Sequence, residues 1–518
     1  MSEENELPEG WVQTTLGSIS VINPGVDTSE IPDSTLVSFI PMAAVEAGTG
    51  RIDSSTLRRL DEVRRGYTAF QEGDVLFAKI TPCMENGKSA VAHSLSSKIG
   101  FGSTEFHVLR PYEGIDPQIL YYYIAQESFR QTARAYMTGT AGQLRVPAAF
   151  LSDAPYPLAP TNEQHRIVAA IEQQFTRLDA SVAALQRART KLKRYRAAVL
   201  KAAVEGKLTE AWRADHPTTE PASVLLERIL KERRAKREAD LRAKGKDPAK
   251  VKYVEPAKPD VEGLPELPEG WCWATIGQIT ECLDYKRMPI NKEERIKRIG
   301  TIPYYGANGQ VGWIDDYIFD ETLVLIVEDE TFIGREIPFS YKITGKTWVN
   351  NHAHVLRPTH GVHVDYLNYS LAYYPFTPLT QGTTGRRKLT QNALMSAPYA
   401  LPPIAEQDEI VAEVERRLSV ISQLETTVEA NLKRAERLRQ SILREAFAGR
   451  LVPQDPNDEP ASVLLERIRS ERNEQSNGRK NGIGASKNSR GRAVKVPEPE
   501  KVDVAGLEQV ELWGHVGD

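Results

Sequence analysis

Two short stretches of the chain end in the same way as a phosphate-binding loop. They are Asn86-Gly87-Lys88-Ser89 and Thr344-Gly345-Lys346-Thr347. Such a loop also needs a glycine five positions before its second glycine, so that backbone amides can cradle the phosphate. Pro82 and Ser340 occupy those two positions. Neither stretch therefore predicts a nucleotide site.

Histidine is a common metal ligand, and four histidines lie close together in the second half of the chain. They are His352, His354, His360 and His363. His354 belongs to the stretch HVLRP at 354–358, which also occurs at 107–111 without such a cluster around it. The repeat favours a strand position for His354 over a metal site.

Other catalytic signatures are missing from the sequence. No GxGxxG follows a strand-like run, and there is no (D/N)PP(Y/F) motif of adenine methyltransferases, since the single Pro-Pro pair stands in Leu401-Pro402-Pro403-Ile404. No Ser/His/Asp or paired-carboxylate set stands out. We therefore predict no catalytic residue, no cofactor-binding residue and no metal ligand in this chain.

The composition limits the class of protein. A length of 518 residues allows two to four domains, and no apolar run is long enough for a membrane span. The acidic N-terminus is unlike a secretory signal, and three cysteines without CxxC spacing fit a reducing, cytoplasmic setting. The net charge of −4 lacks the basic excess of most nucleic-acid-binding domains.

The chain is an internal repeat. PASVLLERI occurs at 221–229 and at 460–468, and LPEGW occurs at 7–11 and at 267–271. Gly139-Thr-Ala-Gly142 returns as Gly382-Thr-Thr-Gly385, and Glu163-Gln164 returns as Glu406-Gln407. Because the order is kept, the two halves are two copies of one design.

Each copy contains a long helical segment, at about 163–205 and 406–448. Apolar residues recur there every seven positions, which favours two helices that pair as an antiparallel coiled coil. Each segment would be about 64 Å long. The alternative is a long helix buried in an ordinary core, against which charged residues on the other faces argue. The predicted seam consists of Ile171, Leu178, Leu185, Leu192 and Val199, matched by Val414, Ile421, Val428, Ala435 and Ile442.

The segments before these helices are rich in strand-like runs and turns, such as VLFAKI and TLVLIV. They differ in sequence apart from the shared motifs. The predicted fold class is α/β (α+β): two small mixed modules separated by two long helices, with a pseudo-two-fold repeat. The predicted boundaries are module 1 at 1–158, a central helical region at 159–250, a linker at 251–266, module 2 at 267–402, a distal helical region at 403–470 and a disordered basic tail at 471–518.

This layout resembles the DNA-specificity subunit of type I restriction-modification systems. The resemblance rests on LPEGW, the GTAG/GTTG stretches, the run-ins PLAPTNEQHRIV and LPPIAEQDEIV, and the helix ends GKL and GRL, and it covers about 7–470. It implies two target-recognition domains, which read the two parts of a split, asymmetric sequence in double-stranded DNA. It also implies helices that set the gap between those parts, in a prokaryotic cytoplasm.

The resemblance further implies the partners. Two methyltransferase subunits would dock on the helices and supply S-adenosylmethionine, while restriction subunits would supply ATP- and Mg-dependent translocation and cleavage. Two other functions stay open: the specificity half of a fused methyltransferase or a nuclease, and a coiled-coil adaptor with no role on DNA.

Residues that could contact DNA are polar or basic and lie on turns beside strands. In module 1 they are Lys79, Thr81, Asn86, Lys88, Ser103, Thr104 and Arg145. In module 2 they are Tyr304, Tyr305, Asn308, Gln310, Asn350, Asn351, Arg386, Arg387 and Lys388. The basic residues after the glycine stretches suit phosphate contact. An ordinary polar turn, or a loop that leads into a helix, is the alternative for each.

Neither module is basic. Lys and Arg number 12 against 15 Asp and Glu over 11–157, and 13 against 13 over 271–401. Since phosphate contacts dominate affinity, we predict weak DNA binding by this chain alone. The tail ends in VDVAGLEQVELWGHV, a degenerate copy of the start of module 2, which could return to module 1 or be a remnant.

Overall fold

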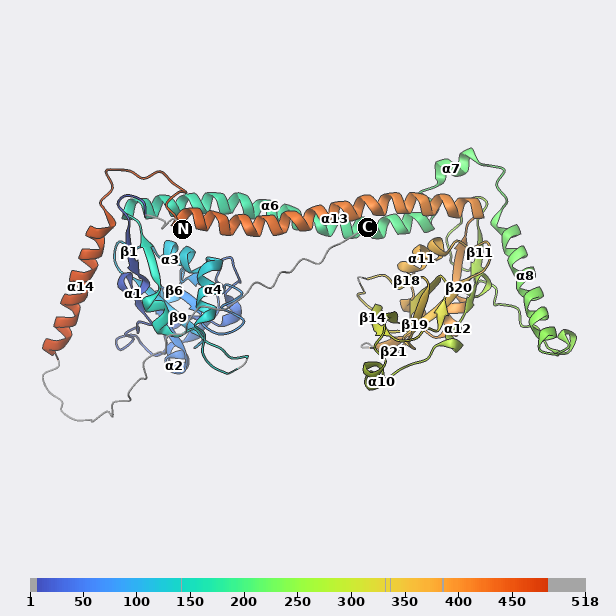
Figure 1. Ribbon diagram of the computed structural model, residues 1–518, viewed down its shortest axis with the longest axis horizontal. Coiled ribbons are helices and arrows are strands. Elements are labelled where there is room, and N and C mark those ends of the chain that lie inside the picture. The colour runs from blue at the N-terminus through green and yellow to red at the C-terminus, as the bar shows by residue number, and fades with distance from the viewer. Residues whose placement is uncertain (1–6, 141, 331, 336, 384–385, 483–518) are drawn as a thin grey trace, which may run out of the picture. The chain divides into compact units, whose positions relative to one another are not determined.

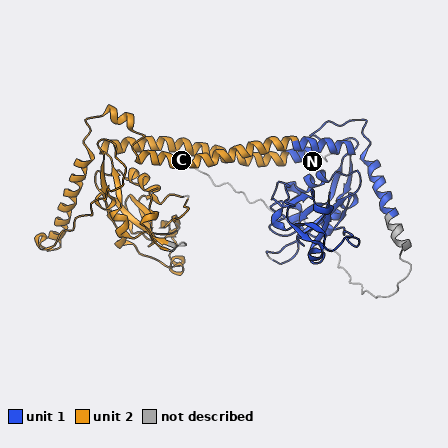
Figure 2. Cartoon of the chain, turned by 180° about the vertical axis from the view of Figure 1, so that it is seen from behind, with its two compact units in different colours: residues 1–172, 442–518 blue, residues 173–441 orange. Residues whose placement is uncertain are grey.

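The computed structural model describes residues 7–482 except 141, 331, 336 and 384–385 (Figure 1). It forms two compact units, shown in two colours in Figure 2. Unit 1 combines the chain up to Glu172 with the chain from Ile442 onward, and unit 2 is Gln173–Ser441. Each unit therefore contains one module together with pieces of both helical regions, a division that differs from the predicted linear domains.

Module 1, as far as it is described, is built from ten strands and five helices. The strands are β1 (Val12–Thr15), β2 (Ser20–Ile22), β3 (Leu36–Ile40), β4 (Leu57–Arg59), β5 (Thr68–Gln71), β6 (Val75–Ala78), β7 (Ser89–Val91), β8 (Ile99–Gly102), β9 (Phe106–Pro111) and β10 (Pro155–Leu158). The helices are α1 (Leu16–Ile19), α2 (Leu60–Val63), α3 (Pro117–Ile124), α4 (Glu127–Ala135) and α5 (Ala148–Asp153).

Module 2 has a related set of elements. The strands are β11 (Cys272–Thr275), β12 (Thr280–Cys282), β13 (Ile302–Gly306), β14 (Gly309–Ile314), β15 (Phe319–Asp320), β16 (Leu323–Val327), β17 (Asp329–Glu330), β18 (Ser340–Ile343), β19 (Lys346–Val349), β20 (Ala353–Pro358), β21 (Gln381–Thr383), β22 (Arg386–Lys388) and β23 (Pro398–Leu401). The helices are α9 (Ile276–Ile279), α10 (Lys292–Lys297), α11 (Val364–Ala372) and α12 (Gln391–Ser396).

The two modules share one topology although their sequences differ. In module 1 the two four-stranded sheets have the orders β2-β9-β6-β7 and β4-β3-β8-β5. In module 2 the corresponding orders are β12-β20-β16-β18 and β14-β13-β19-β15. The parallel pair β3–β8 matches the parallel pair β13–β19. The central strands are apolar and buried, as the runs VLFAKI and TLVLIV predict.

Five helices of the described chain lie outside the modules: α6 (Thr161–Val204), α7 (Glu210–Asp215), α8 (Ala222–Ala243), α13 (Ile404–Phe447) and α14 (Ala461–Gly482). Both long helices begin within a few residues of the predicted positions. Among the residues that the structure describes, no helix is long and apolar enough to cross a membrane. α14 continues past the predicted boundary at 470, through a stretch that contains no proline. The rest of the predicted disordered tail, 483–518, lies outside the described residues.

The long helices pair antiparallel within unit 2. Asp179 contacts Arg439, Arg189 lies 3.9 Å from Glu429, and Arg196 lies 2.9 Å from Glu425. The residue numbers of these partners decrease along α13 as they increase along α6, so the two helices run in opposite directions. All ten predicted seam residues are buried or half-buried. The predicted antiparallel pairing is confirmed.

A tryptophan–glutamate bond joins each module to the start of its long helix. The strand pairs β1–β10 and β11–β23 bring the LPEGW motif next to that helix. Trp11 Nε1 donates to Glu163 at 3.0 Å, and Trp271 Nε1 donates to Glu406 at 2.8 Å. Both carboxylates are buried. The repeated motifs therefore meet in space and close each module.

Each of these carboxylates also accepts a bond from the segment that follows the other long helix. Gln454, which follows α13, donates to Glu163 at 3.2 Å. Thr209, which follows α6, donates to Glu406 at 2.7 Å, and Arg213 forms an ion pair with it. Each unit is consequently completed by residues from both halves of the chain.

Candidate nucleic-acid interface

One buried histidine ties three segments together in each module. In module 1, His107 Nε2 lies 2.8 Å from the carbonyl oxygen of Val146, and Nδ1 lies 3.0 Å from the amide nitrogen of Asn23. Because a carbonyl only accepts, Nε2 carries the proton. Burial lowers the pKa of His107, which fits a neutral ring. The histidine thus anchors the segment that follows the GTAG stretch.

Module 2 repeats this anchor with a charged partner. His354 Nε2 lies 2.8 Å from the carbonyl oxygen of Leu389, and Nδ1 lies 2.5 Å from a carboxylate oxygen of Asp284. Burial by itself would raise the pKa of Asp284, but the bond to His354 and the nearby positive charge outweigh it and the pKa is lowered. Asp284 stands where module 1 has Asn23.

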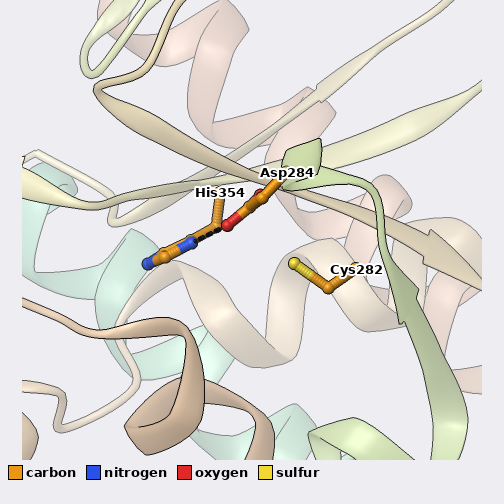
Figure 3. Close-up of side chains that lie close together, drawn as sticks. All are labelled: Cys282, Asp284 and His354. Carbon is orange, nitrogen blue, oxygen red and sulfur yellow. Dashed lines mark hydrogen bonds and ion pairs between the residues drawn. The ribbon is translucent and has the colours of Figure 1, made fainter. Parts of the chain in front are cut away.

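The side chains of Cys282, Asp284 and His354 lie close together (Figure 3), with their potential ligand atoms within 4.8 Å of one another. Metal binding would require a free imidazole nitrogen. Both nitrogens of His354 are engaged by Asp284 and by Leu389. Burial also raises the pKa of the Cys282 thiol to about 12, which keeps it protonated. This group therefore acts as a structural anchor of the strand.

The other histidines of the predicted cluster do not join it. His352 bonds to Asp329 at 2.7 Å, and His363 caps the start of α11 through the amide of Asp365. His360 is exposed. The four histidines therefore do not form one cluster in the described part of the chain.

The histidine anchors hold a common backbone frame at the ends of β6 and β16. In module 1 the backbone amide of Lys79 donates to the backbone carbonyl of Glu105 at 2.9 Å. The carbonyl of Lys79 accepts from the backbone amide of Val146 at 2.9 Å. In module 2 the backbone amide of Glu328 donates to the backbone carbonyl of His352 at 3.1 Å. The carbonyl of Glu328 accepts from the backbone amide of Leu389 at 2.8 Å. Lys79 and Glu328 therefore occupy equivalent positions.

The residue before each anchored carbonyl is basic and belongs to this frame. Arg145 bridges to Ile80 and Thr138, and Lys388 pairs with Asp329 and Gln381. We call the three matched positions the charge frame: Lys79, Glu105 and Arg145 in module 1, and Glu328, His352 and Lys388 in module 2.

Two of the three positions of the charge frame differ in charge between the modules, whereas the third is basic in both. Arg145 holds Glu105 with two bonds of 2.8 and 2.9 Å, which lowers the pKa of that carboxyl. In module 2, burial by itself would raise the pKa of Glu328, but its pairs with Arg287 at 2.5 Å and Lys388 at 3.0 Å outweigh that effect, and the pKa is lowered. The same backbone arrangement therefore carries different charged side chains in the two modules.

The structure places the module 1 candidates around this frame. Thr81 donates its amide to Leu144 at 3.0 Å, which holds it near Arg145. Ser103 and Thr104 lie between β8 and Glu105, and Thr104 is exposed. Asn86 is exposed on the turn after β6, whereas Lys88 donates to the carbonyl of Met42 at 2.9 Å and is half-buried. These positions are compatible with contact, except that Lys88 is already engaged.

The module 2 candidates fall into two groups. Tyr304 and Tyr305 lie on β13 rather than on the predicted loop. Tyr304 is 1% exposed and packs with Ile314 and Trp348, so it holds the hairpin and offers no surface to DNA. The hairpin turn carries the exposed Asn308. Gln310 is exposed on β14.

The second group follows β19 and β21. The backbone amide of Asn350 donates to the carbonyl of Tyr305 at 3.1 Å, and Asn351 beside it is exposed. Arg387 donates to the hydroxyl of Thr380 at 2.6 Å and so stabilises its own hairpin. Lys388 is exposed, with its charge paired to Glu328. The side chain of Arg386 lies outside the described residues.

Sequence reasoning missed the acidic members of the charge frame, Glu105 and Glu328, and it also missed Asp329, which follows Glu328. It looked for side chains that could contact bases, whereas Glu328 is buried and both carboxylate oxygens of Glu105 are bound by Arg145, so these carboxylates set the charge around the candidates. It also missed Trp313, which is 55% exposed on β14. The position of Glu105 directly after Ser103-Thr104 is the signal that could have identified the first of these.

Comparison with known proteins agrees with this architecture. Residues 268–434 match the family model described as type I restriction modification DNA specificity domain. The chain is 29% identical over 492 residues to the Escherichia coli type I restriction enzyme EcoAI specificity subunit, covering 82% of this chain and 80% of that protein. It is 32% identical over 323 residues to the EcoEI specificity subunit of the same organism, covering 54% of this chain and 52% of that protein.

A solved structure shows the same fold. A chain from work on complex assembly and conformational transition of the type I restriction-modification system superposes with a TM-score of 0.59 at 20% identity, covering 86% of this chain and 99% of that one. The sequence matches agree with the repeated modules and the antiparallel helices: residues 268–434 match a type I restriction modification DNA specificity domain, and over most of its length the chain is similar to type I restriction enzyme specificity subunits.

Proposed function

We propose that this chain selects the DNA sequence on which a type I restriction-modification complex acts. Module 1 and module 2 each read one part of a split, asymmetric target. The observation that carries this proposal is the charge frame, in which one backbone arrangement presents Lys79, Glu105 and Arg145 in one module but Glu328, His352 and Lys388 in the other. Two readers of different sequences need such a difference.

The chain also serves as a scaffold in this proposal and does no chemistry itself. The long helices offer matched exteriors to two methyltransferase subunits, and restriction subunits join the complex. S-adenosylmethionine belongs to the methyltransferase partner, and ATP with Mg belongs to the restriction partner. The similarity to type I restriction enzyme specificity subunits supports this division of labour.

Exchange of a module tests the proposal. Residues 12–157 are replaced by the corresponding module of a relative, and methyladenine is mapped across a genome that carries either gene. We expect one half of the methylated sequence to change while the other half is retained. The reciprocal exchange of 272–401 is the matched control and should change only the opposite half. If either exchange altered both halves, the modules would not be independent readers.

A further inference from the structure

Three arginines of module 1 each hold a carboxylate with two hydrogen bonds, from Nε and from Nη2. Arg59 donates to Asp61 at 3.1 and 2.7 Å, Arg110 donates to Asp74 at 2.8 and 2.7 Å, and Arg145 donates to Glu105 at 2.9 and 2.8 Å. Two parallel bonds fix the plane of a guanidinium. Such a pair can brace the fold or hold the arginine ready for a ligand, and the surroundings of each pair decide between these roles.

The pair of Arg110 with Asp74 belongs to the common scaffold. Asp74 is buried, and Arg110 stands in the repeated HVLRP stretch. Its counterpart in module 2, Arg357, likewise donates to Glu321 from Nε and Nη2. A pair that both modules share serves the fold that they share.

The pair of Arg145 with Glu105 has no copy in module 2. The matched positions of the charge frame are occupied there by Lys388 and His352, which do not form such a pair. Lys388 lies 3.0 Å from Glu328 instead. An ammonium group is a point charge, whereas a guanidinium is a planar fork of donors. The two modules therefore differ at one matched position in the shape of the donor, as readers of different sequences should.

Arg145 keeps two N–H groups for a ligand. A guanidinium has five such groups, and Glu105 accepts from Nε and from one hydrogen of Nη2. One hydrogen of Nη1 goes to the carbonyl of Gln143 at 3.1 Å. Among the residues that the structure describes, none accepts the second hydrogen of Nη1 or of Nη2. The side chain of Arg145 is 40% exposed, so a ligand can reach it.

The free groups of Arg145 match a base better than they match the DNA backbone. Lys79 and Arg145 outweigh Glu105, so the charge frame of module 1 carries one net positive charge. Guanine presents two adjacent acceptors, O6 and N7, in the major groove, and one arginine can donate to both. A phosphate could also accept from Arg145, but phosphate contacts carry no sequence information. They give no reason for an arginine that is fixed in one module alone.

We propose that Arg145, held in place by Glu105, reads one guanine in the half-sequence that module 1 recognises. This inference rests on the proposed function and adds to it a base and the residue that reads it. Arg145 touches the base. Glu105 is a positioning residue, which fixes the plane of the guanidinium before DNA binds.

Methylation of synthetic duplexes by the complex of this chain with its methyltransferase subunits tests the proposal. The duplexes carry each of the four bases in turn at every position of the first half-sequence. The wild-type complex should prefer guanine over adenine by about tenfold or more at one position. Arg145→Ala should remove that preference at that position alone, and Glu105→Gln should weaken it there. Arg59→Ala and Asp61→Asn, at the exposed pair on β4 and α2, are the matched controls and should change no preference.

A guanine analogue gives the second measurement. In 7-deazaguanine a carbon replaces N7, so one acceptor is lost while Watson–Crick pairing is kept. At the recognised guanine it should slow methylation by the wild-type complex about fivefold, the effect of one hydrogen bond. The residual rate of the Arg145→Ala complex should not change. Equal slowing of both complexes would overturn the proposal.

The pattern of loss separates base reading from phosphate contact. If Arg145→Ala slowed methylation equally for every base, Arg145 would contact a phosphate and the proposal would be wrong. Continued selectivity for the second half-sequence shows that a variant complex is folded. Glu105→Gln keeps the arginine and gives the same comparison if Arg145→Ala does not assemble. If the module exchange changes one half-sequence but neither variant changes any position of it, the proposed function stands and the guanine reading fails.

Discussion

Single buried carboxylates hold each module to its helix. Glu406 is 1% exposed and accepts bonds from Trp271 and Thr209 as well as an ion pair from Arg213. Removal of one member of a buried charged network costs far more than removal of an exposed pair, because the remaining groups stay buried without partners. The contribution of these bonds to stability can therefore be tested one residue at a time.

Glu406→Ala should destabilise unit 2 by about 3 kcal/mol, a typical cost of breaking a buried pair. The measurement is urea unfolding followed by the fluorescence of the tryptophans. Glu429→Ala is the matched control on the same helix, since Glu429 lies 3.9 Å from Arg189 and its side chain is 51% exposed. It should cost less than about 1 kcal/mol. Equal losses in the two variants would show that the tryptophan–glutamate bond contributes little.

The histidine anchor of module 1 makes the stability of its unit depend on pH. Burial lowers the pKa of His107 below its ordinary value of 6.5. A histidine whose pKa is lowered in the folded state stabilises the fold above the ordinary value, and this stability is lost as the pH falls. Unit 1 should therefore lose stability from about pH 6.5 downward, by at most about 1.4 kcal/mol per pH unit from this group.

Asn23→Asp should remove that loss. Asn23 has a φ of 52°, a conformation that aspartate also tolerates, and the new carboxylate would accept from His107 as Asp284 accepts from His354. The pKa of His107 should rise, as measured by an NMR titration of its imidazole. Thermal unfolding at pH 5 and pH 7 gives the effect on stability. An unchanged pKa would mean that the introduced carboxylate turns away from the ring.

The long helices are the elements that sequence reasoning located best. Ile171 to Val199 and Val414 to Ile442 obey a local seven-residue rule, so the period alone identifies both helices and their buried faces. The modules were harder, because strand order depends on contacts between distant residues. The parallel pairing of β3 with β8 leaves no local signal, and neither does the bond from Trp11 to Glu163. Tyr304 was misplaced because a glycine-rich stretch forms both hairpins and loops.

Insertion of one heptad after Leu185 and another after Val428 tests whether the helices set the target's spacing. The seam is kept, and each helix grows by about 10.5 Å at 1.5 Å per residue. At about 3.4 Å per base pair we expect the gap between the two recognised half-sequences to grow by up to about three base pairs. Activity should fall, because the angle between the half-sites also changes. Methyladenine mapping gives the new site.

Two outcomes of this experiment would contradict the prediction. A folded, methylating variant with an unchanged gap would show that the helices do not set the distance. A changed half-sequence would show that the helices take part in reading bases.

At the scale of the whole molecule, the repeat predicts two equal partner sites. Lys191 and Arg194 on α6 are matched by Arg434 and Arg437 on α13, and all four are exposed. Co-expression with the methyltransferase subunit should give a complex of two partners per chain, as measured by native mass spectrometry. Arg194→Glu or Arg437→Glu should each reduce it to one, and the double variant to none. A wild-type limit of one partner would contradict the two-site model.

The closure of each module by a tryptophan and a glutamate also has a consequence for inheritance. The ends of each module, at LPEGW and at the Glu-Gln pair, form the same tryptophan–glutamate bond in both copies, so a gene segment that encodes any module with these ends can form the bond that closes it. Recombination can then replace one module without a compensating change elsewhere in the gene. Residues from the opposite half of the chain also bind each of these glutamates. A duplicated half-gene would therefore encode two products that supply these bonds to each other. New specificities can in this way arise in a single genetic step, while the scaffold stays unchanged.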